Sequence, residues 1–115
     1  MKILKVTNLN KTSESVLTLY HGTSDVNAEK IEAEGLKRRN LGSRWYTLAD
    51  NFKDAKFHSN VGNGNPVVIE FKIPDTKDEH GFNKWVWDGE KAGEGYWYSL
   101  REDLPSEFIS GIHSL

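Results

Sequence analysis

The residues best suited to chemistry begin with a histidine at the end of a short alternating run. Residues 17–20 alternate apolar and polar side chains, and the chain then reaches His21 and Gly22. Such alternation predicts a strand with one buried face, so His21 is expected at the strand end. At Gly22 the absence of a Cβ lets a ligand approach the backbone closely. The stretch is therefore a candidate site for a small, planar, charged ligand.

Taken alone, His21 allows three interpretations: a general base, a hydrogen-bonding group for a ligand, or a structural residue. The other histidines, His58, His80 and His113, are scattered, and the chain contains no cysteine. Neither observation matches the spacing of a metal site, and without cysteine there is no thiol chemistry and no disulfide framework. We therefore expect no metal.

Two further side chains are candidates because of their type and their neighbours. Tyr46 follows Trp45, and it either stacks on a planar ligand or belongs to the core. Glu107 precedes an apolar run, and it is either a functional carboxylate or an ordinary surface group. The chain has many other carboxylates, and spacing alone selects no acid–base pair among them.

Two short helices and several short strands are predicted to position these residues. Residues 25–34 have a polar face; Ser24 or Asp25 can cap this helix, and Gly35 provides its stop. A second helix is predicted over residues 52–57. Strands are predicted at residues 3–6, 16–20, 45–47, 67–73, 85–87, 96–100 and 108–112. This pattern predicts an α+β fold with a mainly antiparallel sheet.

Length and composition predict one domain, residues 1–115, whose core depends on a few large side chains. The net charge is −2, which is not typical of a constitutive nucleic-acid binder, because phosphate contacts need a basic face. The apolar runs are too short for a signal peptide or a membrane span. We therefore expect a cytoplasmic protein, in the producing cell or in a target cell, with no membrane partner.

These motifs together resemble those of the ADP-ribosyltransferase superfamily, in its diphtheria-toxin and poly(ADP-ribose) polymerase-like branch. That branch has a His-Tyr-Glu triad on three separate strands. Residues 20–24 resemble its first motif, and residues 27–36 resemble the helix that follows. Residues 42–55 resemble the second motif and residues 107–109 the third. The resemblance implies an ADP-ribosyltransferase-like fold, with a mainly antiparallel split sheet and two short helices.

The resemblance also implies a role for each matched residue. His21 would bond the adenosine-side ribose of NAD, and the Gly22 backbone would pair with the nicotinamide amide. Tyr46 would stack on the nicotinamide ring, and Phe57 would cover its other face. Glu107 would bond the nicotinamide-side ribose and stabilise the oxocarbenium-like charge that grows as nicotinamide leaves.

Two further contacts are expected with NAD. Thr23 belongs to the first motif and to the expected NAD-binding residues. Arg44, or the basic loop at residues 37–39, is the expected contact of the NAD phosphates. The role of Glu107 has rivals elsewhere in the chain: Glu70, Glu94 and Glu102.

The resemblance thus implies an NAD-dependent mono-ADP-ribosyltransferase that uses NAD as co-substrate and releases nicotinamide. Its acceptor would be a protein, a nucleic acid or a small molecule, and its size suits a monomeric phage- or toxin-type effector. The alternatives are an NAD glycohydrolase, an RNA 2′-phosphotransferase and a non-catalytic NAD- or ADP-ribose-binding module. Residues 75–95 are the expected determinant of acceptor choice, and the aromatic residues at 85–98 are either core or a stacking platform.

Overall fold

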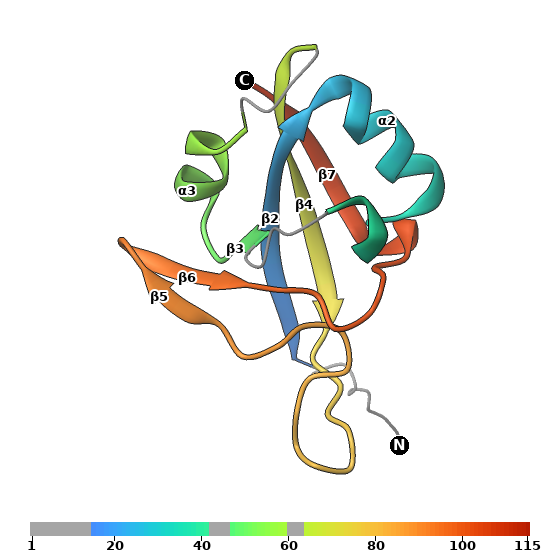
Figure 1. Ribbon diagram of the computed structural model, residues 1–115, viewed down its shortest axis with the longest axis vertical. Helices are drawn as coiled ribbons and strands as arrows, with labels where there is room; N and C mark the ends of the chain where they lie inside the picture. The colour runs from blue at the N-terminus through green and yellow to red at the C-terminus, as the bar shows by residue number, and fades with distance from the viewer. Residues whose placement is uncertain (1–14, 42–46, 60–63) are drawn as a thin grey trace, which may run out of the picture.

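Strand β2 (Val16–Ser24) lies at the centre of the sheet (Figure 1). The computed structural model describes residues 15–41, 47–59 and 64–115. Within them β2 pairs with β3 (Leu48–Ala49) on one side and with β4 (Pro66–Pro74) on the other, both antiparallel. The pairing with β4 extends over the full length of both strands. The predicted strand at residues 3–6 lies outside the described residues.

The described strands form one six-stranded sheet in the order β5-β6-β3-β2-β4-β7. The outer strands are β5 (Glu90–Ala92), β6 (Gly95–Tyr98) and β7 (Ile109–Ser114), and every pairing is antiparallel. The mainly antiparallel sheet is thus confirmed, but the expected split is not found among these strands. The reason is β3, which is only two residues long yet pairs with both β2 and β6.

Helix α2 (Asp25–Glu34) has the bounds that the sequence predicts. Ser24 caps its first turn, because the Ser24 Oγ accepts a hydrogen bond from the Asn27 N–H at 3.2 Å. Gly35 ends the helix with a φ of 87°, and its N–H donates to the Ile31 carbonyl at 2.7 Å. The helix therefore starts directly where β2 ends.

Helix α3 (Phe52–Phe57) also has its predicted bounds, and Asn51 is its cap. The Asn51 Oδ1 accepts from the Asp54 N–H at 2.9 Å. Two short 3-10 helices complete the described structure: η1 (Arg38–Asn40) and η2 (Ser106–Phe108).

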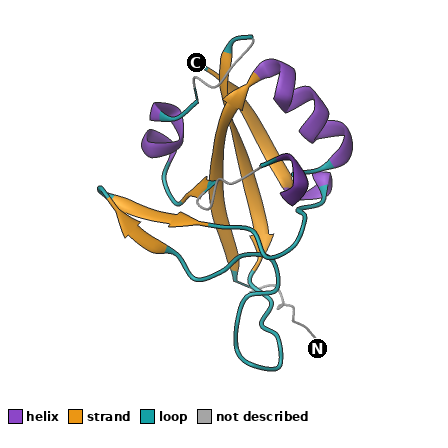
Figure 2. Ribbon diagram, in the orientation of Figure 1, coloured by secondary structure: helices purple, strands orange, loops and turns teal. Residues whose placement is uncertain are grey.

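Alternate residues of β2 enter two separate cores on the two faces of the sheet. Leu19 packs in the larger core together with Ile31 of α2. Tyr20 packs against the smaller core, which contains Ala49 and Ala55. Figure 2 shows the two helices on either side of the strands. We call these two sides the α2 face and the α3 face.

Gly22 lies on the α3 face, where helix α3 comes close to the strand. A Cβ at this position would overlap with the Ala55 carbonyl oxygen and would lie 3.0 Å from the Ser59 Cα. The missing Cβ therefore makes room for a helix backbone. This packing differs from the close approach of a ligand that the sequence predicts at Gly22.

Sequence periodicity misplaces some elements of the second half. The strand predicted at residues 85–87 is a single bridge between Val86 and Leu100. Strand β5 is not predicted, because its three residues are all exposed and two are charged. Glu107, expected at the entrance of the last strand, lies within η2, and β7 begins only at Ile109.

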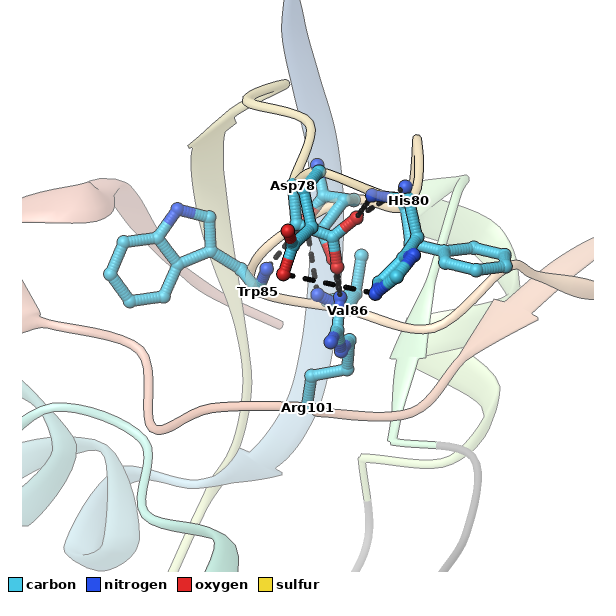
Figure 3. Close-up of polar contacts among 8 residues, drawn as sticks. Asp78, His80, Trp85, Val86 and Arg101 are labelled. Carbon is cyan, nitrogen blue, oxygen red and sulfur yellow. Dashed lines mark hydrogen bonds and ion pairs between the residues drawn. The ribbon is translucent and has the colours of Figure 1, made fainter.

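A polar network holds the long connection between β4 and β5 (Figure 3). The Asp78 Oδ1 accepts hydrogen bonds from the N–H groups of His80 and Phe82 at 2.8 and 3.0 Å. Arg101 donates through Nη1 to the Asp78 Oδ2 at 2.9 Å and to the Asn83 carbonyl at 2.8 Å. Arg101 thus ties the connection to the segment that follows β6.

Asn83 completes this network from the inside. Its side chain is buried, and its Oδ1 accepts from the N–H groups of Trp85 and Val86 at 2.7 and 3.1 Å. Its Nδ2 donates to the Pro74 carbonyl at 3.4 Å and to the Asp75 Oδ1 at 3.1 Å. Both ends of the amide have partners, as burial of a polar group requires.

We predict that Gly22→Ala destabilises the fold by about 2 kcal/mol or more, because the clash is with backbone that cannot rotate away. The matched control is Gly111→Ala, whose added Cβ meets only the flexible His113 side chain, at 3.3 Å. Urea unfolding of both variants measures the difference in the free energy of unfolding. Equal stability of Gly22→Ala and the wild type would contradict the described packing.

The Asp78 network predicts a pH dependence of stability. Hydrogen bonds from the Phe82 N–H and then from Arg101 lower the pKa of Asp78 from 3.8 to about 2. The stabilisation by the ionised carboxylate is therefore fully present above about pH 4 and is lost as the pH falls toward 2. We expect Asp78→Asn to lower the urea midpoint at pH 6 and to match the wild type near pH 2.

Glu79→Gln is the control for this experiment, since the Glu79 side chain is 86% exposed and lies beside Asp78 in sequence. It should follow the wild type at every pH. If the urea midpoint of Asp78→Asn stays below that of the wild type by a constant amount from pH 6 to pH 2, the negative charge of Asp78 is not what stabilises the fold.

Candidate functional site

His21 is buried on the α2 face of the sheet, with 3% of its surface exposed. Its Nδ1 lies 3.0 Å from the Thr47 carbonyl oxygen, next to β3. A carbonyl oxygen only accepts, so Nδ1 carries the proton in this hydrogen bond. The bond fixes the orientation of the imidazole from the neighbouring strand.

A pocket of about 270 Å³ opens beside this histidine, between the end of β2, helix α2 and the segment around η1. Its lining residues are His21, Thr23, Asn27, Lys30, Ile31, Leu36, Lys37, Asn40 and Leu41. We call it the His21 pocket. Its wall combines an imidazole, a hydroxyl, two amides and two ammonium groups with three aliphatic side chains, so it suits a polar ligand.

Thr23 is the second residue that β2 contributes to the His21 pocket. It is 2% exposed, and its Oγ1 accepts a hydrogen bond from the Asn27 Nδ2 at 3.3 Å. Because strand residues two apart share a face, His21 and Thr23 reach the pocket together. The structure therefore brings together two of the predicted NAD-binding residues.

Sequence reasoning missed three polar residues of this pocket: Asn27, Lys30 and Asn40. Asn27, Lys30 and Ile31 are spaced three and four apart, so they share one face of α2. That spacing, read from the helix start at Ser24, was the signal available in the sequence. Asn40 follows the basic loop, and no local pattern indicates its place.

Two of the other predicted ligand contacts, Gly22 and Phe57, are described, and their positions differ from those of His21 and Thr23. Gly22 faces α3, and Phe57 is 82% exposed on α3, with its ring centroid 5.2 Å from that of His58. Neither lines the His21 pocket. Tyr46 and Arg44 lie outside the described residues, so their roles stay predictions.

Glu107 is exposed and lies in η2, away from the lining of the His21 pocket. This segment runs beside the end of α2, because Leu104 and Leu36 form a bridge there. The expected role of Glu107 in catalysis stays a prediction, resting on the motif alone.

Its rivals do not line the His21 pocket either. Glu70 lies on the α3 face, where its carboxylate contacts Ser110 at 3.0 Å, Lys72 and His113 at 3.4 Å. The hydrogen bond from Ser110 is the main reason why the pKa of Glu70 is lowered, although partial burial opposes it. Glu94 pairs with Lys53 at 3.3 Å.

The aromatic residues after β4 divide between core and surface. Trp85 packs edge-on against Phe108, with centroids 5.0 Å apart, and it contacts the larger core. Trp87 is 48% exposed, and the Arg101 guanidinium lies 4.5 Å from the centre of its ring. Trp85 therefore belongs to the core, whereas Trp87 is half-exposed at the surface, so the two residues differ in the role that the sequence left open.

Comparison with protein-family models finds no match for this chain, and a search of curated proteins finds none either. Among the described residues no group of three or more His, Cys, Asp or Glu side chains is placed to hold a metal ion. None of the helices in residues 15–41, 47–59 and 64–115 is long and apolar enough to cross a membrane.

Proposed function

We propose that this chain binds NAD in the His21 pocket and transfers its ADP-ribose to an acceptor, with release of nicotinamide. The observation that carries the proposal is the shared position of His21 and Thr23. Both belong to the first motif of the ADP-ribosyltransferase resemblance, both are buried, and both line the same polar pocket.

The orientation of His21 suits a sugar hydroxyl. The hydrogen bond between its Nδ1 and the Thr47 carbonyl fixes the orientation of the ring in the pocket wall. An imidazole held in this way in the pocket wall can form a hydrogen bond with a ribose hydroxyl of the ligand. The pocket, at about 270 Å³, would hold one part of a dinucleotide, and the rest would extend along the surface.

The proposed reaction breaks the bond between the nicotinamide nitrogen and C1′ of its ribose. The bonding electrons leave with nicotinamide, whose ring nitrogen thereby loses its positive charge. The ribose becomes oxocarbenium-like, and the acceptor forms a new bond to C1′ and gives up its proton. A carboxylate near the ribose would stabilise that charge, which is the role proposed for Glu107.

The second candidate is a non-catalytic NAD- or ADP-ribose-binding module. One observation favours it: no carboxylate is among the described residues that line the His21 pocket. Such a module would bind the ligand with the same histidine and threonine but would leave the glycosidic bond intact. The two candidates therefore differ in nicotinamide release and agree in binding.

His21→Ala tests the proposed binding site. We expect it to weaken NAD binding, measured by calorimetry, by roughly tenfold or more, because it removes a positioned hydrogen bond inside a pocket. Release of nicotinamide, measured by chromatography, should fall as well. The matched control is His80→Ala, since the His80 side chain is 74% exposed and lies outside the pocket. Unchanged NAD affinity in a folded His21→Ala would contradict the proposal.

Glu107→Ala separates the two candidates. A transferase that uses this carboxylate should lose nicotinamide release by about 100-fold, with NAD affinity retained. Glu70→Gln, Glu94→Gln and Glu102→Gln, measured in parallel, show whether another carboxylate has the role. If the wild type binds NAD but releases no nicotinamide with any acceptor present, the binding module is the correct candidate.

A further inference from the structure

The charge of the His21 pocket points to the part of the ligand that it holds. The fully charged groups in its lining are the ammonium groups of Lys30 and Lys37, one from α2 and one from the segment before η1. No described carboxylate lies in the lining to balance them. A pocket with this composition favours an anion over a neutral or cationic ligand.

Among the described residues, three other lysines form ion pairs with carboxylates, whereas Lys30 and Lys37 do not. Lys53, Lys72 and Lys77 form ion pairs of 3.1 to 3.4 Å with carboxylates. Within residues 15–41, 47–59 and 64–115, neither Lys30 nor Lys37 forms an ion pair. This holds although Glu34 follows Lys30 by one helical turn, the spacing at which such pairs form.

The neighbouring groups match a phosphate as well. The side-chain amides of Asn27 and Asn40 line the same pocket, and amide N–H groups donate hydrogen bonds to phosphate oxygens. Each ammonium adds three donors and a point charge on a flexible stem. The ribose-binding side, with His21 and Thr23, lies in the same wall.

We infer that Lys30 and Lys37 bind the diphosphate of NAD or ADP-ribose in the His21 pocket, a step that rests on the proposed function. The sequence indicated Arg44 or the basic loop at residues 37–39 for this contact. Of that loop, the pocket lining includes only Lys37, since Arg38 and Arg39 are exposed outside it. In the inferred site, Lys30 of the preceding helix α2 makes the phosphate contact that the sequence predicted for the rest of the basic loop.

The test is binding of ADP-ribose and of adenosine, measured by calorimetry on the wild type and on the double variant Lys30→Gln/Lys37→Gln. We expect the double variant to bind ADP-ribose roughly tenfold or more weakly, because charge-assisted hydrogen bonds are lost. Its affinity for adenosine, which has no phosphate, should be unchanged. Higher salt should weaken ADP-ribose binding to the wild type more than to the variant.

Lys56→Gln is the matched control, since Lys56 is an exposed lysine on α3, on the other face of the sheet. It should bind ADP-ribose as the wild type does, and circular dichroism checks that all variants are folded. Equal ADP-ribose affinity in the double variant and the wild type overturns the inference and leaves the proposed function intact. If ADP-ribose binding depends on both lysines but no nicotinamide is released from NAD, the transferase fails and the inference stands. If the wild type binds neither ADP-ribose nor adenosine, both the inference about the lysines and the proposed function are wrong.

Discussion

The rest of the structure depends on strand β2, which packs against a separate core on each of its two faces. Leu19 and His21 point to the α2 face, while Tyr20 and Gly22 point to the α3 face. A slip of one residue in the pairing with β4 would exchange these sets and would place Tyr20 where Leu19 packs. The direction of His21 is therefore a consequence of core packing and needs no ligand to establish it.

At the end of β2 one face of the sheet is filled by packing, while the other face is open to a pocket. On the α3 face Gly22 lets the Ala55 carbonyl come close, so that side is filled by backbone. On the α2 face the chain turns into α2 at Asp25 and returns through Lys37, and a polar pocket remains between these segments. The same strand end thus provides a packing contact on one side and a candidate ligand site on the other.

The sequence predicts best the elements whose local signals agree with their tertiary setting. Both helices have their predicted bounds because caps and stops mark them, and β4 is a strongly apolar run between a loop and a proline. Strand β5 could not be predicted, since three exposed residues pair only because the hairpin with β6 brings them together. Similarly, the bridge at Val86 depends on Leu100, which is distant in sequence.

The residues of the candidate site also divide into those that local sequence signals predict and those whose position depends on tertiary packing. His21 and Thr23 could be predicted from strand alternation and from the motif around them, and the structure places both in one pocket. The role of Lys30 could not be predicted, because it depends on how α2 lies against the end of β2. Phe57 and Glu107 were placed by order along the chain, which does not say on which face of a sheet a residue lies.

The central claim is that the ligand binds on the α2 face, at the end of β2. The most direct measurement is a titration of the ¹⁵N-labelled protein with ADP-ribose, followed by the amide chemical shifts. The account predicts that the largest shifts belong to the strand end and the facing helix, at residues 21–30, and to Lys37. Shifts centred on the α3 face around Phe57, or no shifts at saturating ADP-ribose, would contradict it.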